Sequence, residues 1–174
     1  KITRHFQEIF NLPESRISTL ATGIDLEKFS PEGPRGELPG KVSGVPLIGM
    51  ISVLRSWKGH GTFLEAAKKL KAENFNARFV IVGEGPQRQN LEAKIAELGL
   101  SDIAALAGHR EDVPAVLRTL DALCIPSTKH EGVPQIGLQA LACKTAVVGS
   151  DVGGIPEIIR PGETGRIFPA NDAA

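Results

Sequence analysis

Short apolar runs alternate with amphipathic stretches along most of the sequence. Continuous apolar runs are typical of buried strands, and apolar positions repeated every three or four residues are typical of helices with one buried face. We predict strands in 45–54, 77–83, 122–126, 145–150 and 166–169, with IAALAG (103–108) as a further apolar run. We predict helices in 61–73, 86–99, a short segment from Asp112, 133–143 and 155–159.

This alternation predicts a three-layer Rossmann-like α/β domain, with a mainly parallel sheet and helices on both faces. Such sheets bind ligands beyond the carboxyl ends of their strands, near a switch in strand order. A site is therefore expected in the loops that follow the apolar runs. These loops read RSWKGHG, GEGP, GHRED, PSTKHEGVP and SDVGG.

Composition narrows the function classes. The chain has 174 residues, enough for one domain with a sizeable core, and its 41% hydrophobic content is ordinary for a soluble protein. Twenty basic and twenty acidic residues cancel, so the net charge gives no reason to expect nucleic acid as a partner. The apolar runs are too short to span a bilayer and no signal peptide is recognised, which predicts a cytoplasmic protein.

The cysteines, the chain ends and one internal segment add further expectations. Cys124 and Cys143 lie in apolar segments without a Cys/His cluster, so buried reduced thiols are expected and a metal is not. KITRHFQEIF has apolar residues at helical spacing and no initiator Met, and we interpret the chain as a piece of a longer one. Residues 30–46 are rich in Pro and Gly, which predicts an exposed connector.

Two of the loops give weak signals for a phosphate ligand. RSWKGHG places Arg55 and Lys58 beside the start of a helix, an arrangement that suits a diphosphate, although a solvated basic loop is the alternative. Trp57 could stack on a base, but packing at a hinge or interface is the commoner use. GEGP lacks the full dinucleotide fingerprint, and a strand–helix turn with Pro86 at the first helical position explains it equally well.

The stretch HEGVPQIGLQAL (130–141) gives the sharpest signal. With Pro134 at the first helical position, the amides of Gln135 and Ile136 are free to face an anion at the positive end of the helix dipole. Gln139 leans back toward the same place, because helix side chains tilt toward the N-terminus, and Glu131 lies just outside. Amides for phosphate and acceptors for hydroxyls predict a phosphate-plus-sugar ligand. A plain helix cap would explain the proline but not both polar side chains.

Four stretches resemble, in order, a known protein family. VIVGEGPQRQNLEAKIAELGL, AGHREDVP, IPSTKHEGVPQIGLQALAC and VVGSDVGGIPEII resemble the C-terminal, donor-binding domain of the group 1 (family 4) retaining glycosyltransferases, which have the GT-B fold. TGIDLEKFSP (22–31) is similar to the segment that ends the interdomain crossing, and RPGETGRIFP to the turn before the last strand. The resemblance implies that 1–21 is the tail of the preceding domain's last helix with a linking segment. It implies a nucleotide-sugar-binding domain in 22–174.

The resemblance also implies an activity. The full-length enzyme would move a sugar from a nucleotide diphosphate sugar to an acceptor with retention of configuration, without a metal or cofactor. This chain would hold the donor and the missing N-terminal domain would hold the acceptor, so the fragment alone would be inactive. Association of the full-length enzyme with the inner face of a membrane is left open.

Site residues can be carried over from the family by matching motifs. Lys58 matches the lysine that, with an arginine, binds the diphosphate and stabilises the departing charge. Glu131 matches the first Glu of the Glu-x7-Glu motif, which contacts the donor sugar. The resemblance thus implies a catalytic set of Arg55, Lys58 and Glu131, and donor-binding residues Gly83, Arg110, Gly132, Val133, Pro134, Gln135, Ile136 and Gln139.

Two positions depart from the family pattern. The family's arginine position is occupied by Val53, so Arg55 would have to serve instead. The second Glu, which accepts from the ribose hydroxyls, is replaced by Gln139, and a neutral amide offers one acceptor oxygen only. A subfamily with altered donor contacts and a degenerate, non-catalytic nucleotide-sugar-binding module both fit. Another GT-B enzyme, an epimerase or a phosphorylase with pyridoxal phosphate, would share the fold.

Overall fold

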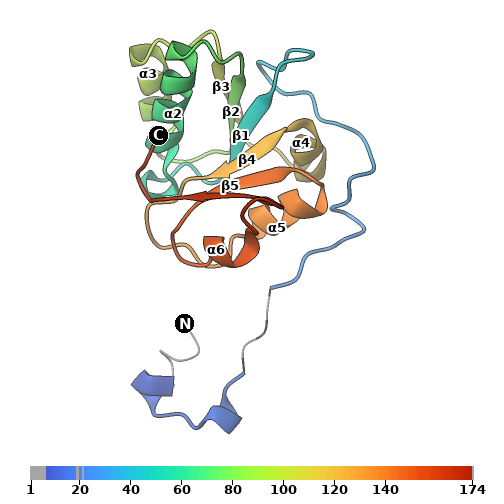
Figure 1. The fold of residues 1–174 in the computed structure, drawn as a ribbon, viewed down its shortest axis with the longest axis vertical. Helices are drawn as coiled ribbons and strands as arrows, with labels where there is room; N and C mark the ends of the chain where they lie inside the picture. Colours follow the sequence, from blue (N-terminus) through green and yellow to red (C-terminus); the bar gives the residue numbers. More distant parts are fainter. Residues whose placement is uncertain (1–6, 19, 21, 174) are drawn as a thin grey trace.

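A computed structural model describes residues 7–18, 20 and 22–173 and contains a parallel sheet with helices on both faces (Figure 1). Residues 7–10 are helical, and the remainder of the predicted N-terminal helix lies outside the described residues. The strands are β1 Leu47–Ile51, β2 Arg78–Val82, β3 Ala104–Gly108, β4 Ala122–Ile125, β5 Ala146–Ser150 and β6 Gly165–Phe168. The helices are α2 His60–Ala72, α3 Arg88–Glu97, α4 Val113–Thr119, α5 Gln135–Ala142 and α6 Ile155–Ile158, with short 3-10 helices η1 Glu14–Arg16 and η2 Ser56–Lys58.

The strand order of the sheet reverses its direction at the centre. The six strands are parallel and hydrogen-bonded in the order β3-β2-β1-β4-β5-β6. The chain winds outward from β1 to β3, then returns to the other side of β1 and winds outward from β4 to β6. The predicted Rossmann-like fold class is confirmed, and the switch point lies between the carboxyl ends of β1 and β4.

Alternate strand residues pack into two cores, one on each face of the sheet. Phe79 and Ile81 of β2 pack with α2 and α3, where Phe63 meets Phe79 edge to face at 5.7 Å between ring centroids. Val80 and Val82 point the other way and pack with α4, α5 and α6. Figure 1 shows these two helical layers on opposite sides of the strands. The period of two along the strand therefore produces the three layers.

Two predicted helix starts are wrong by one or two residues. Pro86 does not begin α3, because the amide of Gln87 donates to the carbonyl of Leu54 and the helix starts at Arg88. Pro134 has φ −74° and ψ 111°, an extended conformation, and precedes α5 as its N-cap instead of occupying the first helical position. The helix begins at Gln135, so the amides of its first turn still lie where the sequence placed them.

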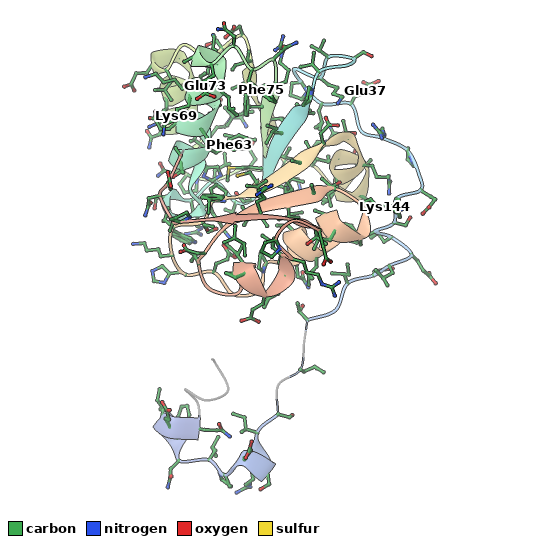
Figure 2. All side chains as sticks on the ribbon, viewed as in Figure 1. Glu37, Phe63, Lys69, Glu73, Phe75 and Lys144 are labelled. Atoms are coloured by element: carbon green, nitrogen blue, oxygen red, sulfur yellow. The ribbon has the colours of Figure 1, made fainter. Side chains whose placement is uncertain are left out.

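The predicted connector is mostly exposed but is attached to the domain. Phe29, just before it, and Leu38, within it, are buried in the core beside α4. Arg118 of α4 donates to the carbonyls of Ser30 and Pro34, at 3.1 and 2.8 Å, while Glu37 lies on the outer edge of the molecule (Figure 2). The segment has few apolar side chains, and these hydrogen bonds from Arg118 to its backbone carbonyls attach it to α4.

The two cysteines are free and lie on opposite faces of the sheet, as expected for reduced thiols. Burial raises the pKa of the Cys124 thiol to about 12, so it stays protonated at neutral pH. Within the described residues, no helix has the length and apolar character needed to cross a membrane.

Candidate functional site

The loops after β1 and β4 meet at the switch point. The backbone amide of Thr128 donates to the carbonyl of Trp57 at 2.8 Å, which joins the two loops. Gly59 makes the approach possible, because its φ is 78° and a Cβ there would collide with the carbonyl oxygen of Pro126. The RSWKGHG and PSTKHEGVP loops are therefore one unit in space.

The centre of this unit is an ion pair between Lys58 and Glu131. The Lys58 ammonium lies 2.8 Å from one carboxylate oxygen of Glu131 and 3.1 Å from the other. The Glu131 side chain is only 10% exposed and that of Lys58 26%, so both charges are partly removed from water. The hydroxyl of Ser127 donates to the same carboxylate at 2.6 Å. Two of the predicted catalytic residues thus come together.

Two helices start beside this pair. α2 begins immediately after the Lys58 loop, and α5 begins at Gln135, four residues after Glu131. The first amides of a helix have no intrahelical acceptor. Within the described residues, the N-cap residues of these two helices, Gly59 and Pro134, form no side-chain hydrogen bond that caps them. The helix dipoles add partial positive charge at the same edge. Pro134 and Ile136 line a small cavity together with Ser52, Lys58, Ser127 and Glu131. The arrangement suits an anion that can compete with the Glu131 carboxylate for Lys58.

The loop after β5 packs against the backbone of the loop that carries Glu131. The backbone oxygen of Glu131 packs against Gly153, which has φ 58° and no room for a Cβ. The amide of Gly154 donates to the carbonyl of Gly132 at 3.2 Å. The Ser150 hydroxyl donates to the carbonyl of Ser127 at 2.6 Å. The SDVGG loop therefore fixes the backbone that carries Glu131.

Comparison with known proteins identifies the family. The family model of glycosyl transferases group 1 matches residues 38–174. The chain belongs to this family. It is 30% identical over 164 residues to the UDP-Gal:alpha-D-GlcNAc-diphosphoundecaprenol alpha-1,3-galactosyltransferase of Escherichia coli, a match that covers 90% of this chain and 42% of the relative. The group 1 chain thus spans about two fifths of the length of the curated relatives that it matches.

Two solved structures show how the group 1 chain compares in space. The C-terminal domain of a glycosyl transferase group 1 family protein from Francisella tularensis is 29% identical, with a TM-score of 0.71, over 87% of this chain and 82% of that one. Anabaena HepE in complex with UDP-glucose is 22% identical, with a TM-score of 0.73, over 87% of this chain and 43% of that one. The second likeness shows the fold alone.

Other predicted site residues of this glycosyltransferase chain have partners elsewhere. The guanidinium of Arg55 lies over the Trp57 ring, 5.3 Å from its centroid, so this tryptophan packs against a cation. Arg110 donates to Asp112 at 2.6 and 2.7 Å and to the carbonyl of Glu37 at 2.7 Å, which holds the connector. Gly83, with φ 136°, allows the GEGP loop to pack against the carbonyl of Ser52. Within the described residues, the side chains of Arg55 and Arg110 contact these partners and not the Lys58–Glu131 pair, and the predicted site roles of all three residues stay predictions.

The remaining predictions concern the start of α5. Gly132 and Val133 are exposed just before the helix, and Gln139 lies half-buried one turn after Gln135. In the described part of the chain, the side chain of Gln139 forms no hydrogen bond, and it does not line the small cavity. Its predicted contact with a ribose stays a prediction.

Sequence reasoning did not find three polar side chains of the candidate site. Ser52 directly follows β1 and Ser127 lies two residues after the end of β4, positions at the ligand edge that could have marked them. His60 lies 3.0 Å from the Ser52 hydroxyl through its Nε2 and is only 3% exposed. Burial lowers the pKa of His60 to about 4, a hydrogen bond with the backbone of Arg55 partly offsets this, and the charge of Lys58 adds to the lowering. The imidazole is therefore neutral at pH 7.

Proposed function

We propose that this chain is the donor-binding half of a glycosyltransferase that transfers a sugar from a nucleotide diphosphate sugar with retention of configuration. The observation that carries the proposal is the Lys58–Glu131 pair at the switch point, in front of the first amides of α5. Membership of the group 1 family supports the reaction class, and the resemblance to family 4 supports retention.

Each part of the site has a role in this proposal. Lys58 turns from Glu131 to the diphosphate and neutralises the negative charge that grows on it as the sugar departs. The free amides of Gln135 and Ile136 donate to diphosphate oxygens, as helix N-termini do. Glu131, released by Lys58, accepts hydrogen bonds from the sugar hydroxyls. UDP is the first nucleotide to test, because UDP-glucose is bound in the Anabaena structure.

The test replaces the central cation. Lys58→Ala should weaken UDP binding by roughly 1.5–3 kcal/mol, the range for a hydrogen bond to a charged group. Isothermal titration calorimetry measures the affinity, with GDP and ADP run in parallel. Lys69→Ala is the matched control, because Lys69 is exposed on α2 (Figure 2) and its loss should leave the affinity unchanged. If wild type and Lys58→Ala bind UDP with equal affinity, the diphosphate does not bind beside Lys58.

A second candidate function keeps the binding site but not the turnover. The observation that favours it is Gln139, where the family pattern has its second Glu. Product formation by the full-length protein separates the two candidates. The anomeric configuration of that product, read by NMR, tests retention.

A further inference from the structure

The carboxylate of Glu131 has two side-chain partners in the part of the chain that the structure describes. Lys58 donates to both oxygens, and the Ser127 hydroxyl donates to Oε2 at 2.6 Å. The proposed function takes Lys58 away, because the same ammonium has to bind the diphosphate. Only the serine then holds the carboxylate while a donor is bound.

Ser127 is itself held in place by burial and by a hydrogen bond. It is fully buried, two residues after the end of β4, and its carbonyl accepts the 2.6 Å hydrogen bond from Ser150. Ser150 is also fully buried, at the end of β5. The hydrogen bond to Ser150 ties the Ser127 backbone to the neighbouring strand, so this short side chain has less freedom to move than the long side chain of Lys58. Its hydroxyl therefore remains within hydrogen-bonding distance of the Glu131 carboxylate.

We propose that Ser127 is a positioning residue for Glu131, one that keeps the carboxylate aimed at the donor sugar after Lys58 has turned to the diphosphate. The inference rests on the proposed function. A hydrogen bond to an ionised acceptor is short and strong, and it restricts the directions that a carboxylate can take. Without it, Glu131 would rotate toward water or remain on Lys58. Loss of Ser127 should therefore harm recognition of the sugar more than recognition of the nucleotide.

The experiment compares two affinities of the full-length protein. Calorimetry gives Kd values for UDP and for whichever of UDP-glucose and UDP-galactose the wild type binds better. In Ser127→Ala, affinity for the nucleotide sugar relative to UDP should fall by about tenfold or more, the equivalent of one lost charge-assisted hydrogen bond. Affinity for UDP itself should stay close to the wild-type value. Thr145→Val is the matched control, because it removes a buried hydroxyl that donates to the carbonyl of Leu117 at 2.7 Å.

A double-mutant cycle separates positioning from a general effect on folding. In a Glu131→Gln background, Ser127→Ala should change the ratio of affinities little further, because the carboxylate through which it acts is gone. If Ser127→Ala does not fold, Ser127→Cys keeps a similar volume with a weak donor and serves the same comparison.

The outcomes distinguish this inference from the proposed function. An unchanged ratio in a folded Ser127 variant, or the same loss in the Glu131→Gln background, would overturn the positioning role alone. If the wild type binds neither UDP nor the other nucleoside diphosphates, the proposed function fails, and the inference fails with it.

Discussion

Gln139 is one of the two departures of this chain from the family pattern. It lies one turn along α5 from Gln135, on the same face of the helix, and its amide forms no hydrogen bond within the described residues. A carboxylate in its place could accept from both hydroxyls of a ribose, whereas the amide has one acceptor oxygen. Gln139→Glu should therefore tighten UDP binding by about 1 kcal/mol, the value of one improved hydrogen bond.

Titration of UDP into wild type and Gln139→Glu checks this prediction. Gln135→Glu provides a control for added negative charge, because Gln135 lies on the same helix face but is exposed and bonds to Thr22. Should Gln139→Glu bind UDP more weakly than wild type does, the ribose role carried over from the family is wrong.

His60 gives a prediction about pH. Its pKa is about 4 in the folded chain and about 6.5 without burial. The unfolded chain therefore binds more protons between these values, and folding stability falls as the pH falls from 6.5 to 4. The loss due to His60 should reach about 3 kcal/mol near pH 4, since each pKa unit corresponds to about 1.4 kcal/mol.

Urea denaturation of wild type and His60→Gln between pH 4 and 7 isolates this contribution. Carboxylates such as Asp112, whose pKa is lowered by Arg110, lose stabilisation in both proteins as the pH falls. The wild type should lose about 3 kcal/mol more than His60→Gln does. Parallel stability curves would show that the histidine is not the source of the acid sensitivity.

At the scale of elements, the two central loops depend on one glycine. Gly59 has φ 78° and touches Pro126, whereas Gly40 has the same φ with nothing within 4 Å of a Cβ. Alanine at both positions would adopt the same strained backbone, but only at position 59 would it push a loop away. Gly59→Ala should therefore destabilise the fold by about 2 kcal/mol more than Gly40→Ala does.

Thermal and urea unfolding of the two variants measure this difference directly. Because Gly59 adjoins Lys58 and the displaced β4 loop carries Glu131, Gly59→Ala should also weaken UDP binding, and Gly40→Ala should not. Equal destabilisation of both variants would mean that the β4 loop yields without cost. The contact would then be incidental to the site.

The sequence predicts elements well where the signal is local. Phe79 to Val82 form a continuous apolar run, and such a run specifies a strand buried on both faces. The end of α3 is likewise marked by Gly99, with its left-handed φ of 66°. The predicted starts of α3 and α5 are wrong by one or two residues. The start of a helix depends on contacts beyond the helix as well as on its own residues. The Leu54 carbonyl that captures the amide of Gln87 is one such contact.

The same distinction explains what was predicted of the site. Lys58 and Glu131 could be placed at the ligand edge because both follow strands of a parallel sheet. That their strands are neighbours depends on sheet order, which no local pattern encodes. Sequence reasoning misses Ser127 and His60, because the role of a hydroxyl or an imidazole depends on the group to which it is hydrogen-bonded. Those partners, Ser52 for His60 and Glu131 for Ser127, are brought close by the way the loops fold.

At the scale of the molecule, the chain contains what a stable domain requires. The sheet has one core with α2 and α3 and another with α4, α5 and α6, and the second is completed by Phe29 and by Leu38 of the connector. A core covered on both faces does not depend on another domain for its burial. The Francisella structure is itself a C-terminal domain, and it matches this chain over 82% of its length.

We therefore expect the isolated chain to fold, to bind UDP weakly and to transfer no sugar. The Lys58–Glu131 pair and the start of α5 belong to it, so part of the donor affinity should remain. Transfer needs an acceptor held in line with the donor, and positioning of this kind accounts for a large share of catalytic rates. The chain spans about 40% of the length of its first relatives, so in this proposal residues outside the chain supply the acceptor site.

A radiolabelled UDP-sugar assay with a panel of acceptors, run beside the full-length protein, measures the difference in transfer. Acceptor-dependent transfer by the isolated chain at a rate comparable to that of the full-length protein would show that this chain holds the complete active site.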